Sequence, residues 1–343
     1  MTLVLKALDL TTEPAWDRFV HAMPQASFFH LAGWRRVIEQ AFGHRTLYTV
    51  AERDGAIVGI LPLAQVKTAL FGNTLISVPF CVYGGPVGVD HETTRALEDY
   101  ATGLMRQTGA SAVEFRYQNE VTSEWVGRPD LYVTFSKPIE ADADRNMKAI
   151  PRKQRAMVRK GIQNELVSIA GQDTDALHRV YAESVRNLGT PVFSRHYFRI
   201  LANEFSDCMD VVTILDQDTP VASVMNFYFR DAVLPYYGGG TARARGRAAN
   251  DFMYWEVMRR AAERGARSFD FGRSKIGTGA FAFKHNWGFE ALPLHYRYAL
   301  KPGGAIPELN PNNPKYRLFI AAWRKLPITV ANVIGPHIVR GIG

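Results

Sequence analysis

Glycine and arginine residues are concentrated in one short segment in the second half of the chain. Three consecutive glycines, Gly238–Gly240, precede three arginines within five positions, and a helix-like segment begins at Asn250. Glycines let a ligand approach the backbone, and amide groups at a helix N-terminus favour anions. We predict that this segment binds the phosphate groups of an activated donor; a surface loop with solubilising arginines is the alternative. The predicted donor contacts are Gly239, Gly240, Arg243, Arg245, Gly246, Arg247 and Asn250.

A second candidate is Lys284, which lies within the aromatic segment 281–290. Phe283 precedes it and Trp287 follows it. Aromatic neighbours partly desolvate an ammonium group, which strengthens its effect on a developing oxyanion. We predict that Lys284 stabilises the oxyanion of an acyl transfer, so that Lys284→Ala slows the chemical step and leaves folding nearly intact. The alternative is a surface lysine whose stem lies along a buried aromatic strip.

Polar residues near the ends of strand-like segments supply further candidates. Asp270 ends such a segment and is predicted to accept a proton or to hold the attacking amine. Capping of the strand end is an equally good interpretation of Asp270. These assignments require the arginine segment and Lys284 to converge on one pocket. The predicted substrate contacts are Arg152, Arg155, Asn226, Tyr236, Tyr237, Arg273, Phe283 and Trp287.

A strongly basic segment lies between the two halves of the chain. No acidic residue occurs from Asn146 to Asn164, whereas five basic residues lie between positions 152 and 160. On a helix, Arg152, Arg155 and Arg159 would share one face. This face predicts either contacts with phosphate groups or an ordinary solvated surface.

Other chemistries lack their characteristic motifs in the sequence. The nine histidines are scattered, with no H-E-x-x-H and no paired cysteines, so no metal site is predicted. The G-x-S-x-G and G-x-x-x-x-G-K-[ST] turns are also absent. No tightly bound cofactor is expected, and the activated donor would be a co-substrate.

Composition indicates a globular protein with two hydrophobic cores. The chain has 343 residues, of which 47% are hydrophobic and 22% are charged. Its net charge of +8 favours anionic partners. Two cysteines, no leader-like segment and no apolar run of about 20 residues predict a cytoplasmic location.

The elements that would position these residues occur twice along the chain. In the first half, Tyr83–Gly85 precedes a helix-like segment that ends at Gly109, followed by a strand-like segment. In the second half, Tyr237–Gly239 precedes a helix-like segment that ends at Gly265, again followed by a strand-like segment. Hairpin-like strands come before both copies, with Asp54–Gly55 as one turn. We therefore predict an α/β (α+β) fold of two lobes, each a mostly antiparallel sheet flanked by helices.

Four segments follow from this reading. Residues 1–140 form a first, acceptor-binding lobe, 141–165 the basic connection, 166–305 a second, donor-binding and catalytic lobe, and 306–343 a tail. From Asn310 to Gly343 there is no acidic residue, and basic and apolar residues alternate. Such a segment could lie at a membrane surface. Packing of the tail on the second lobe is the alternative.

Two motifs resemble known acyltransferases. Arg243-x-x-Gly246-x-Ala248 is similar to the Q/R-x-x-G-x-G/A pyrophosphate turn of the GNAT acyltransferases. Phe283-Lys284-x-x-Trp287-Gly288-Phe289 resembles the F-K-x-x-F-G segment of the FemAB-like aminoacyltransferases, with Trp in place of Phe. The resemblance covers most of residues 25–300 and is closest to the branch associated with exosortase and exopolysaccharide (PEP-CTERM) systems.

This resemblance implies two tandem GNAT-like lobes and an N-acyltransferase. FemAB-like enzymes transfer aminoacyl groups from tRNA to envelope precursors, which implies an anionic envelope precursor as acceptor and tRNA as the donor's carrier, with no role for DNA. An acyl-CoA or acyl-carrier donor is the first alternative. A basic scaffold that docks on RNA or on the inner face of a membrane is the non-enzymatic alternative.

Overall fold

The computed structural model describes residues 2–69, 71–128, 131–306 and 314–342. The chain forms two compact units: unit 1 is Met1–Leu131, Pro293–Leu309 and Arg340–Gly343, and unit 2 is Tyr132–Leu292 and Asn310–Val339. The boundaries of these units differ from the four segments predicted from the sequence. Residues 132–140, predicted in the first lobe, and the basic segment 141–165 are part of unit 2. Residues 293–305, predicted in the second lobe, belong to unit 1, and most of the tail belongs to unit 2.

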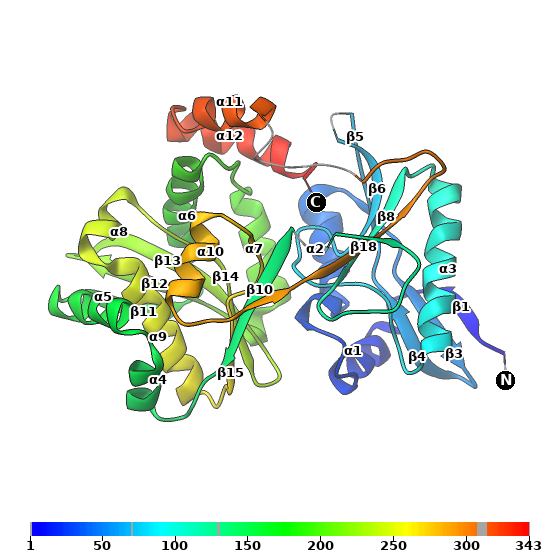
Figure 1. The fold of residues 1–343 in the computed structure, drawn as a ribbon, viewed down its shortest axis with the longest axis horizontal. Coiled ribbons are helices and arrows are strands. Elements are labelled where there is room, and N and C mark those ends of the chain that lie inside the picture. The colour runs from blue at the N-terminus through cyan, green and yellow to red at the C-terminus, as the bar shows by residue number, and fades with distance from the viewer. Residues whose placement is uncertain (1, 70, 129–130, 307–313, 343) are drawn as a thin grey trace. The chain divides into compact units, whose positions relative to one another are not determined.

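The described residues of unit 1 form two sheets and three α-helices (Figure 1). The first sheet has the order β1 (Val4–Ala7), β3 (Thr49–Arg53), β4 (Ala56–Leu61), β7 (Val87–Gly88). The second has the order β2 (Arg45–Thr46), β5 (Ala64–Thr68), β6 (Gly72–Ser77), β8 (Ala112–Tyr117), β18 (His295–Leu300), β9 (Val126–Gly127). The helices are α1 (Glu13–Ala22), α2 (Gly33–Phe42) and α3 (His91–Thr108).

Local signals in the sequence of unit 1 are confirmed. Asp54 and Gly55 both have positive φ and form the predicted turn between β3 and β4. The Asp90 carboxylate caps α3 by accepting from the Thr93 amide, and Gly109 ends the helix with a φ of 65°. The helix crosses between β6 and β8, which are parallel, so this connection is the predicted helix crossover of the first lobe.

Unit 2 is built on one eight-stranded sheet. The strand order is β11 (Val167–Gly171), β12 (Met209–Asp216), β13 (Thr219–Phe229), β14 (Ala232–Gly240), β15 (Ser268–Asp270), β10 (Tyr132–Pro138), β16 (Ser274–Lys275), and β17 (Ala291–Pro293) pairs with β10. The helices are α4 (Ala143–Ala149), α5 (Arg152–Gln163), α6 (Thr174–Leu188), α7 (Arg195–Glu204), α8 (Ala242–Arg247), α9 (Ala249–Glu263), α10 (Gly279–Asn286), α11 (Pro314–Trp323) and α12 (Ile328–Val339).

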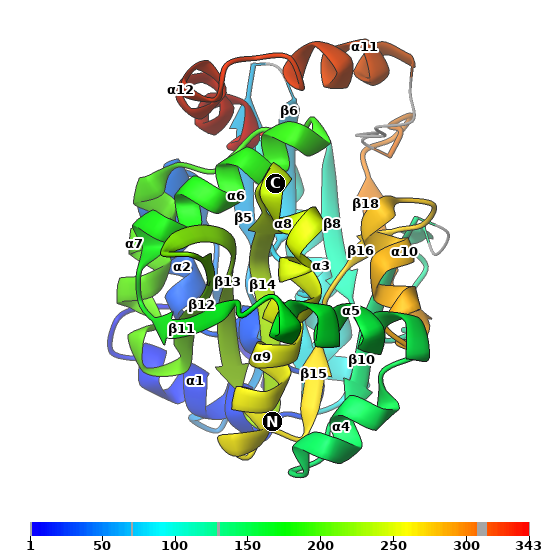
Figure 2. The ribbon, with the colours of Figure 1, turned by 90° about the vertical axis from the view of Figure 1, so that its left-hand side faces the viewer.

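Helices cover both faces of the unit 2 sheet (Figure 2). Alternate residues of a strand point to opposite faces. Val224 of β13 lies in the core cluster that includes Phe252 and Met253 of α9, whereas Tyr237 of β14 contacts Tyr181 of α6. The helix α9 therefore packs on one face and α6 on the other. Both the mixed α/β class and the two lobes predicted from the sequence are confirmed.

Candidate functional site

The centre of unit 2 is a place where two parallel strands separate. Parallel pairing of β14 with β15 is limited to Ala232–Ser268 and Val233–Phe269, after which β14 runs on to Gly240. The strand β15 ends at Asp270, whose Oδ1 accepts from the Gly272 amide at 2.7 Å. This bond turns the chain away from β14. Asp270 therefore caps the strand end, and its proposed role as a proton acceptor stays a prediction.

Tyr254 of α9 lies between the two separated chain segments. Its ring packs edge-on against Phe271, with ring centroids 4.8 Å apart. A Cβ atom added to Gly238 would lie 3.2 Å from the Tyr254 hydroxyl oxygen. This tyrosine was not among the residues predicted from the sequence, where it looks like one more apolar position of a buried helix.

Lys284 binds the turn that follows β15. Its ammonium group donates to three backbone carbonyls, those of Phe271 at 2.7 Å, Gly272 at 3.0 Å and Arg273 at 2.9 Å. Burial lowers the pKa of Lys284 to about 7, against the opposing charge of Asp270. An ammonium group has three N–H donors, so an oxyanion would have to replace one of these carbonyls. Lys284 thus stabilises the turn itself, and its contact with an oxyanion stays a prediction.

The arginine segment is a short helix, α8, and not an open loop. Arg243 Nε lies 2.8 Å from Oδ2 of Asp216, and Arg247 Nη2 lies 3.1 Å from Oδ1 of the same carboxylate. Asp216 is 2% exposed. Arg247 also donates to the backbone oxygen of Asn164 at 2.9 Å. Two of the three predicted phosphate-binding arginines are therefore held by a buried carboxylate of this chain, and the side chain of Arg245 is exposed.

A second carboxylate occupies the N-terminus of α8. The Ala242 amide donates to Oε1 of Glu183, on α6, at 2.8 Å. Together, Asp216 and Glu183 place two negative charges against the three arginines. Neither acidic residue was predicted from the sequence to belong to the site, because each is far from α8 along the chain. An anionic ligand at α8 would have to compete with both carboxylates.

Helix packing accounts for two of the three glycines at the end of β14, Gly239 and Gly240. A Cβ on Gly239 would lie 2.5 Å from Ser184 of α6, and a Cβ on Gly240 would lie 2.4 Å from Oδ1 of Asn250 in α9. Because successive residues face opposite sides of the sheet, the helices on both faces reach the strand here. A Cβ on Gly246 would meet nothing within 4 Å. Neighbouring side chains, rather than a ligand, account for the close approach to Gly239 and Gly240.

The two predicted halves of the site lie on opposite sides of β14. In the order of strands, Asp216 on β12 is on one side, and the Phe271–Arg273 turn that follows β15 is on the other. Arg243 and Arg247 turn toward Asp216, and the convergence of the arginine side chains and Lys284 on one pocket stays a prediction. These arginines reach across the β12–β13 hairpin because their carboxylate partner lies there.

Three of the predicted substrate contacts are buried in the interior. Trp287 is fully buried and donates from Nε1 to Oδ1 of Asp251 at 3.0 Å. Tyr237 joins an aromatic cluster on the α6 side, with its hydroxyl 2.7 Å from that of Tyr197. Asn226 is fully buried and donates to Asp210 at 2.8 Å. The prediction that these three contact a substrate is wrong, because their side chains are enclosed by the core.

The remaining predicted contacts are partly exposed. Arg273 lies over the ring of Tyr132, with its guanidinium carbon 4.7 Å from the ring centroid. Phe283 packs against the ring of Tyr254. Tyr236 packs edge-on against Tyr237. Because these three side chains are partly exposed, their contact with a substrate stays a prediction.

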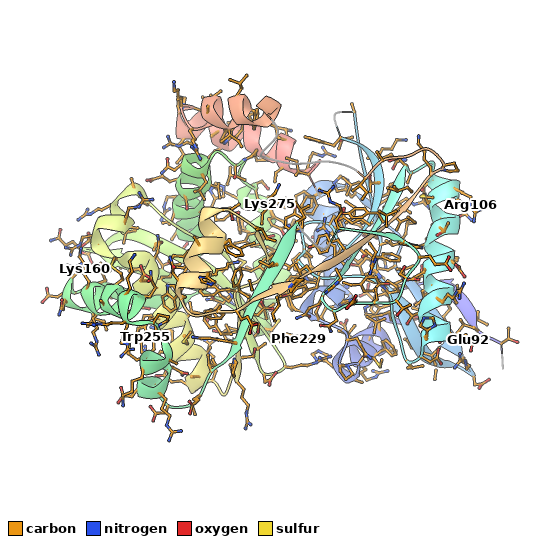
Figure 3. All side chains as sticks on the ribbon, viewed as in Figure 1. Glu92, Arg106, Lys160, Phe229, Trp255 and Lys275 are labelled. Atoms are coloured by element: carbon orange, nitrogen blue, oxygen red, sulfur yellow. The ribbon has the colours of Figure 1, made fainter. Side chains whose placement is uncertain are left out.

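The basic face predicted on α5 lines a groove of about 500 Å³. Arg152, Arg155 and Arg159 border it, with Ala156 and Gln163. Arg155 donates to the carbonyls of Ile150 and Lys148, whereas Arg152 and Arg159 are exposed. Figure 3 shows basic side chains on this helix, Lys160 among them, projecting away from the rest of unit 2. The described part of unit 2 thus carries an exposed basic surface on α5, and its contact with phosphate groups stays a prediction.

Unit 1 contains a polar cavity where its own parallel strands separate. The strands β6 and β8 pair from Thr74–Ala112 to Ser77–Phe115, and a cavity of about 400 Å³ lies beyond them. Among the described residues that line it there is no lysine or arginine. His30 closes one side, with Nε2 3.2 Å from the Gly85 oxygen. The cavity suits hydroxyl, amide or amine groups better than phosphate groups. The lining residues are Gln25, His30, Tyr83, Gly84, Pro86–His91, Thr94 and Tyr117–Val121.

No group of three or more His, Cys, Asp or Glu side chains in the described residues could hold a metal ion. None of the described helices has the length and apolar character needed to cross a membrane.

Comparison with known proteins identifies the domain in unit 2. Residues 145–285, which lie within that unit, match the acetyltransferase (GNAT) domain family. Domains of this fold generally use an acyl-CoA as a co-substrate and hold no tight cofactor. No curated protein matches the chain in sequence.

Solved structures share the fold over both units. FemX superposes with a TM-score of 0.65 at 15% identity, covering 92% of this chain and 100% of FemX. The C-terminal domain of a putative lysylphosphatidylglycerol synthetase from Agrobacterium fabrum has a TM-score of 0.56 at 13% identity, covering 85% and 92%. A tandem GNAT protein from the clavulanic acid biosynthesis pathway has a TM-score of 0.54 at 15% identity, covering 87% and 98%. The chain thus has the tandem GNAT fold of FemAB-like proteins, and the acetyltransferase domain in unit 2 makes it an acyltransferase.

Proposed function

We propose that the chain is an N-acyltransferase that transfers an aminoacyl or acyl group to an amine of a cell-envelope precursor. The observation that carries this proposal is the separation of β14 from β15 within the acetyltransferase domain, with Lys284 holding the turn on one side. FemX and the putative lysylphosphatidylglycerol synthetase share the fold, and the latter is named for a lysyl-modified phospholipid. An association with exopolysaccharide systems stays a prediction.

The reaction needs little covalent chemistry from the protein. The neutral acceptor amine attacks the carbonyl carbon of an ester or thioester, so that a C–N bond forms and the C–O or C–S bond breaks. The proton lost by the amine goes to the departing oxygen or sulfur. An activated donor needs mainly positioning and stabilisation of the oxyanion. The Phe271–Arg273 turn, held by Lys284 and by the Asp270 cap, forms a rigid wall beside the opening.

The distribution of charge favours a donor carried by tRNA. Arg243, Arg247 and the N-terminus of α8 are already occupied by Asp216 and Glu183, which weakens that helix as a site for the diphosphate of CoA. The α5 face is exposed, and the sequence around it has no acidic residue. A polyanion gains from such an extended basic surface because it releases counterions on binding. An acyl-CoA donor is the second candidate, supported by the usual co-substrate of the domain family.

The donor is tested by binding and transfer with the full chain. We expect aminoacylated tRNA to raise the melting temperature, and CoA to raise it less. The double variant Arg152→Ala/Arg159→Ala should bind tRNA more weakly and lower the slope of log affinity against log salt by about 1 to 2. Arg179→Ala, an exposed arginine on α6, is the matched control. Equal tRNA affinity in the double variant and the control would remove α5 from donor binding.

A second variant separates the two donors. Glu183→Gln removes a carboxylate from the Ala242 amide, so it should strengthen CoA binding only if CoA binds at α8. Glu290→Gln, an exposed charge change elsewhere in unit 2, is its control. Transfer of labelled aminoacyl or acetyl groups to amine-bearing precursors tests the activity itself. RNA binding with a steep salt dependence and no transfer from either donor would favour the scaffold alternative.

A further inference from the structure

The C-terminal helices α11 and α12 pack on one end of unit 2, beside α6 (Figures 1 and 2). A Cβ on Gly335 would lie 2.9 Å from the Val192 amide nitrogen, and a Cβ on Gly189 would lie 2.5 Å from Cγ2 of Ile320. Arg324 donates to the Leu188 carbonyl at 3.3 Å. Packing of the tail on the second lobe, one of the two readings of the sequence, is therefore confirmed for this part. Residues 307–313 and 343 of the predicted tail lie outside the described residues, as do the side chains of 314–317.

Three of the five exposed side chains of α12 are apolar, and Thr329 and His337 are the other two. Ala331 and Gly335 are buried against α6 and its following loop, whereas Val333 is 65% exposed and Ile334 is 42% exposed. A surface helix of a globular protein normally has a polar outer face. In α11, Leu318 is 78% exposed. The exposed apolar side chains of this end, called here the tail face, are Leu188, Leu318, Phe319, Val330, Val333 and Ile334.

The charges beside the tail face are positive. Arg324 and Lys325, both exposed, lie in the turn between the two helices. The sequence has no acidic residue from Asn310 to Gly343. Clustered exposed apolar groups mark interaction surfaces. Basic residues at their edge complement an anionic lipid surface, to which each contributes when it comes near the headgroups.

We propose that the tail face binds an anionic membrane surface, with α11 and α12 lying in the interface. Their lengths, 10 and 12 residues, are too short to span a bilayer, which needs about 20. In this arrangement Leu318, Val333 and Ile334 enter the boundary between headgroups and acyl chains, and Lys325 lies among the headgroups. This proposal concerns location and is independent of the donor and the acceptor.

Flotation with vesicles tests the proposal on the full chain. The wild type should float with vesicles of phosphatidylglycerol and phosphatidylcholine, and less with pure phosphatidylcholine or at high salt. Leu318→Asp/Val333→Asp should lower the partition coefficient at least tenfold, because both side chains are exposed and charge is excluded from the acyl region. Leu10→Asp, at an exposed leucine of unit 1 (74%), is the matched control.

Lys325→Gln keeps the test decisive if the double variant fails to fold. It should lower partitioning into anionic vesicles about fivefold and leave partitioning into neutral vesicles unchanged. Flotation of the double variant equal to that of Leu10→Asp overturns the proposal. A second result would also overturn the proposal: light scattering shows that the wild type is a dimer without lipid binding and that the double variant is a monomer. The tail face would then bind a second copy of the chain.

Discussion

Replacing Lys284 by methionine tests how an ammonium group is kept inside unit 2. Methionine retains an unbranched apolar stem but donates no hydrogen bond. The carbonyls of Phe271, Gly272 and Arg273 then lose their donor. At pH 9 a side chain with a pKa of about 7 is a neutral amine in the folded protein, with two N–H donors, and a neutral hydrogen bond contributes about 0.5–1.5 kcal/mol. We expect the variant to lose about 1–3 kcal/mol of unfolding free energy near pH 9. The sequence alone predicted that folding of Lys284→Ala would stay nearly intact, whereas the three hydrogen bonds predict a measurable loss of stability.

The loss should depend on pH, with a sign set by the lowered pKa. The pKa of Lys284 is about 7 in the folded protein and near its ordinary value of 10.5 in the unfolded chain. Between these values the unfolded chain binds a proton that the folded protein has lost, so the stability of the wild type rises with pH. The maximum slope is about 1.4 kcal/mol per pH unit. Allowing for partial solvation, we expect the free energy of unfolding of the wild type to rise by about 2 kcal/mol between pH 7.5 and pH 10. Lys284→Met should show no such rise.

Urea denaturation of both proteins at several pH values in this range measures the effect. Subtracting the free energies of unfolding of the two proteins cancels the titration of other groups, provided that both free energies fall with urea concentration at the same slope. A difference that does not change with pH would refute the reasoning. It would mean that the three carbonyls hold the ammonium group in its charged form with an ordinary pKa.

Two further predictions concern packing around α9. Trp287→Phe should lower the free energy of unfolding by about 2 kcal/mol at pH 7 and by less at pH 4. The substitution removes a hydrogen bond from Asp251, whose pKa is already raised by burial, so the charged form of Asp251 becomes less favourable. An equal loss at both pH values, measured by urea denaturation, would contradict this reasoning. Gly240→Ala should cost about 1–3 kcal/mol because its Cβ would lie 2.7 Å from that of Ala244. Gly246→Ala, with open space around it, should change the midpoint of thermal unfolding little, and equal effects of the two substitutions would exclude packing as the reason for the glycine run.

Features that depend on neighbours along the chain were predictable. The helix-like segment from Asn250 predicted α9, Gly109 predicted the end of α3, and Asp54–Gly55 predicted a hairpin turn. The basic groove on α5 was predictable for the same reason, since Arg152 and Arg159 share a face through helix geometry alone. Repetition of one order of elements likewise predicted the two lobes.

The sequence by itself thus determined the helices, the doubled arrangement and the residue types that acyl transfer needs. Only the tertiary structure decided what those residues do. Asp216 pairs with two arginines of α8 and Glu183 accepts from the amide at its N-terminus, through contacts set by the register of the sheet and the placement of α6. Lys284 likewise reaches carbonyls 11 to 13 residues earlier in the chain. The sequence shows the same residue type whether a charged side chain or a glycine faces a ligand, a carboxylate or a neighbouring helix. Its partner is fixed only when distant segments pack together.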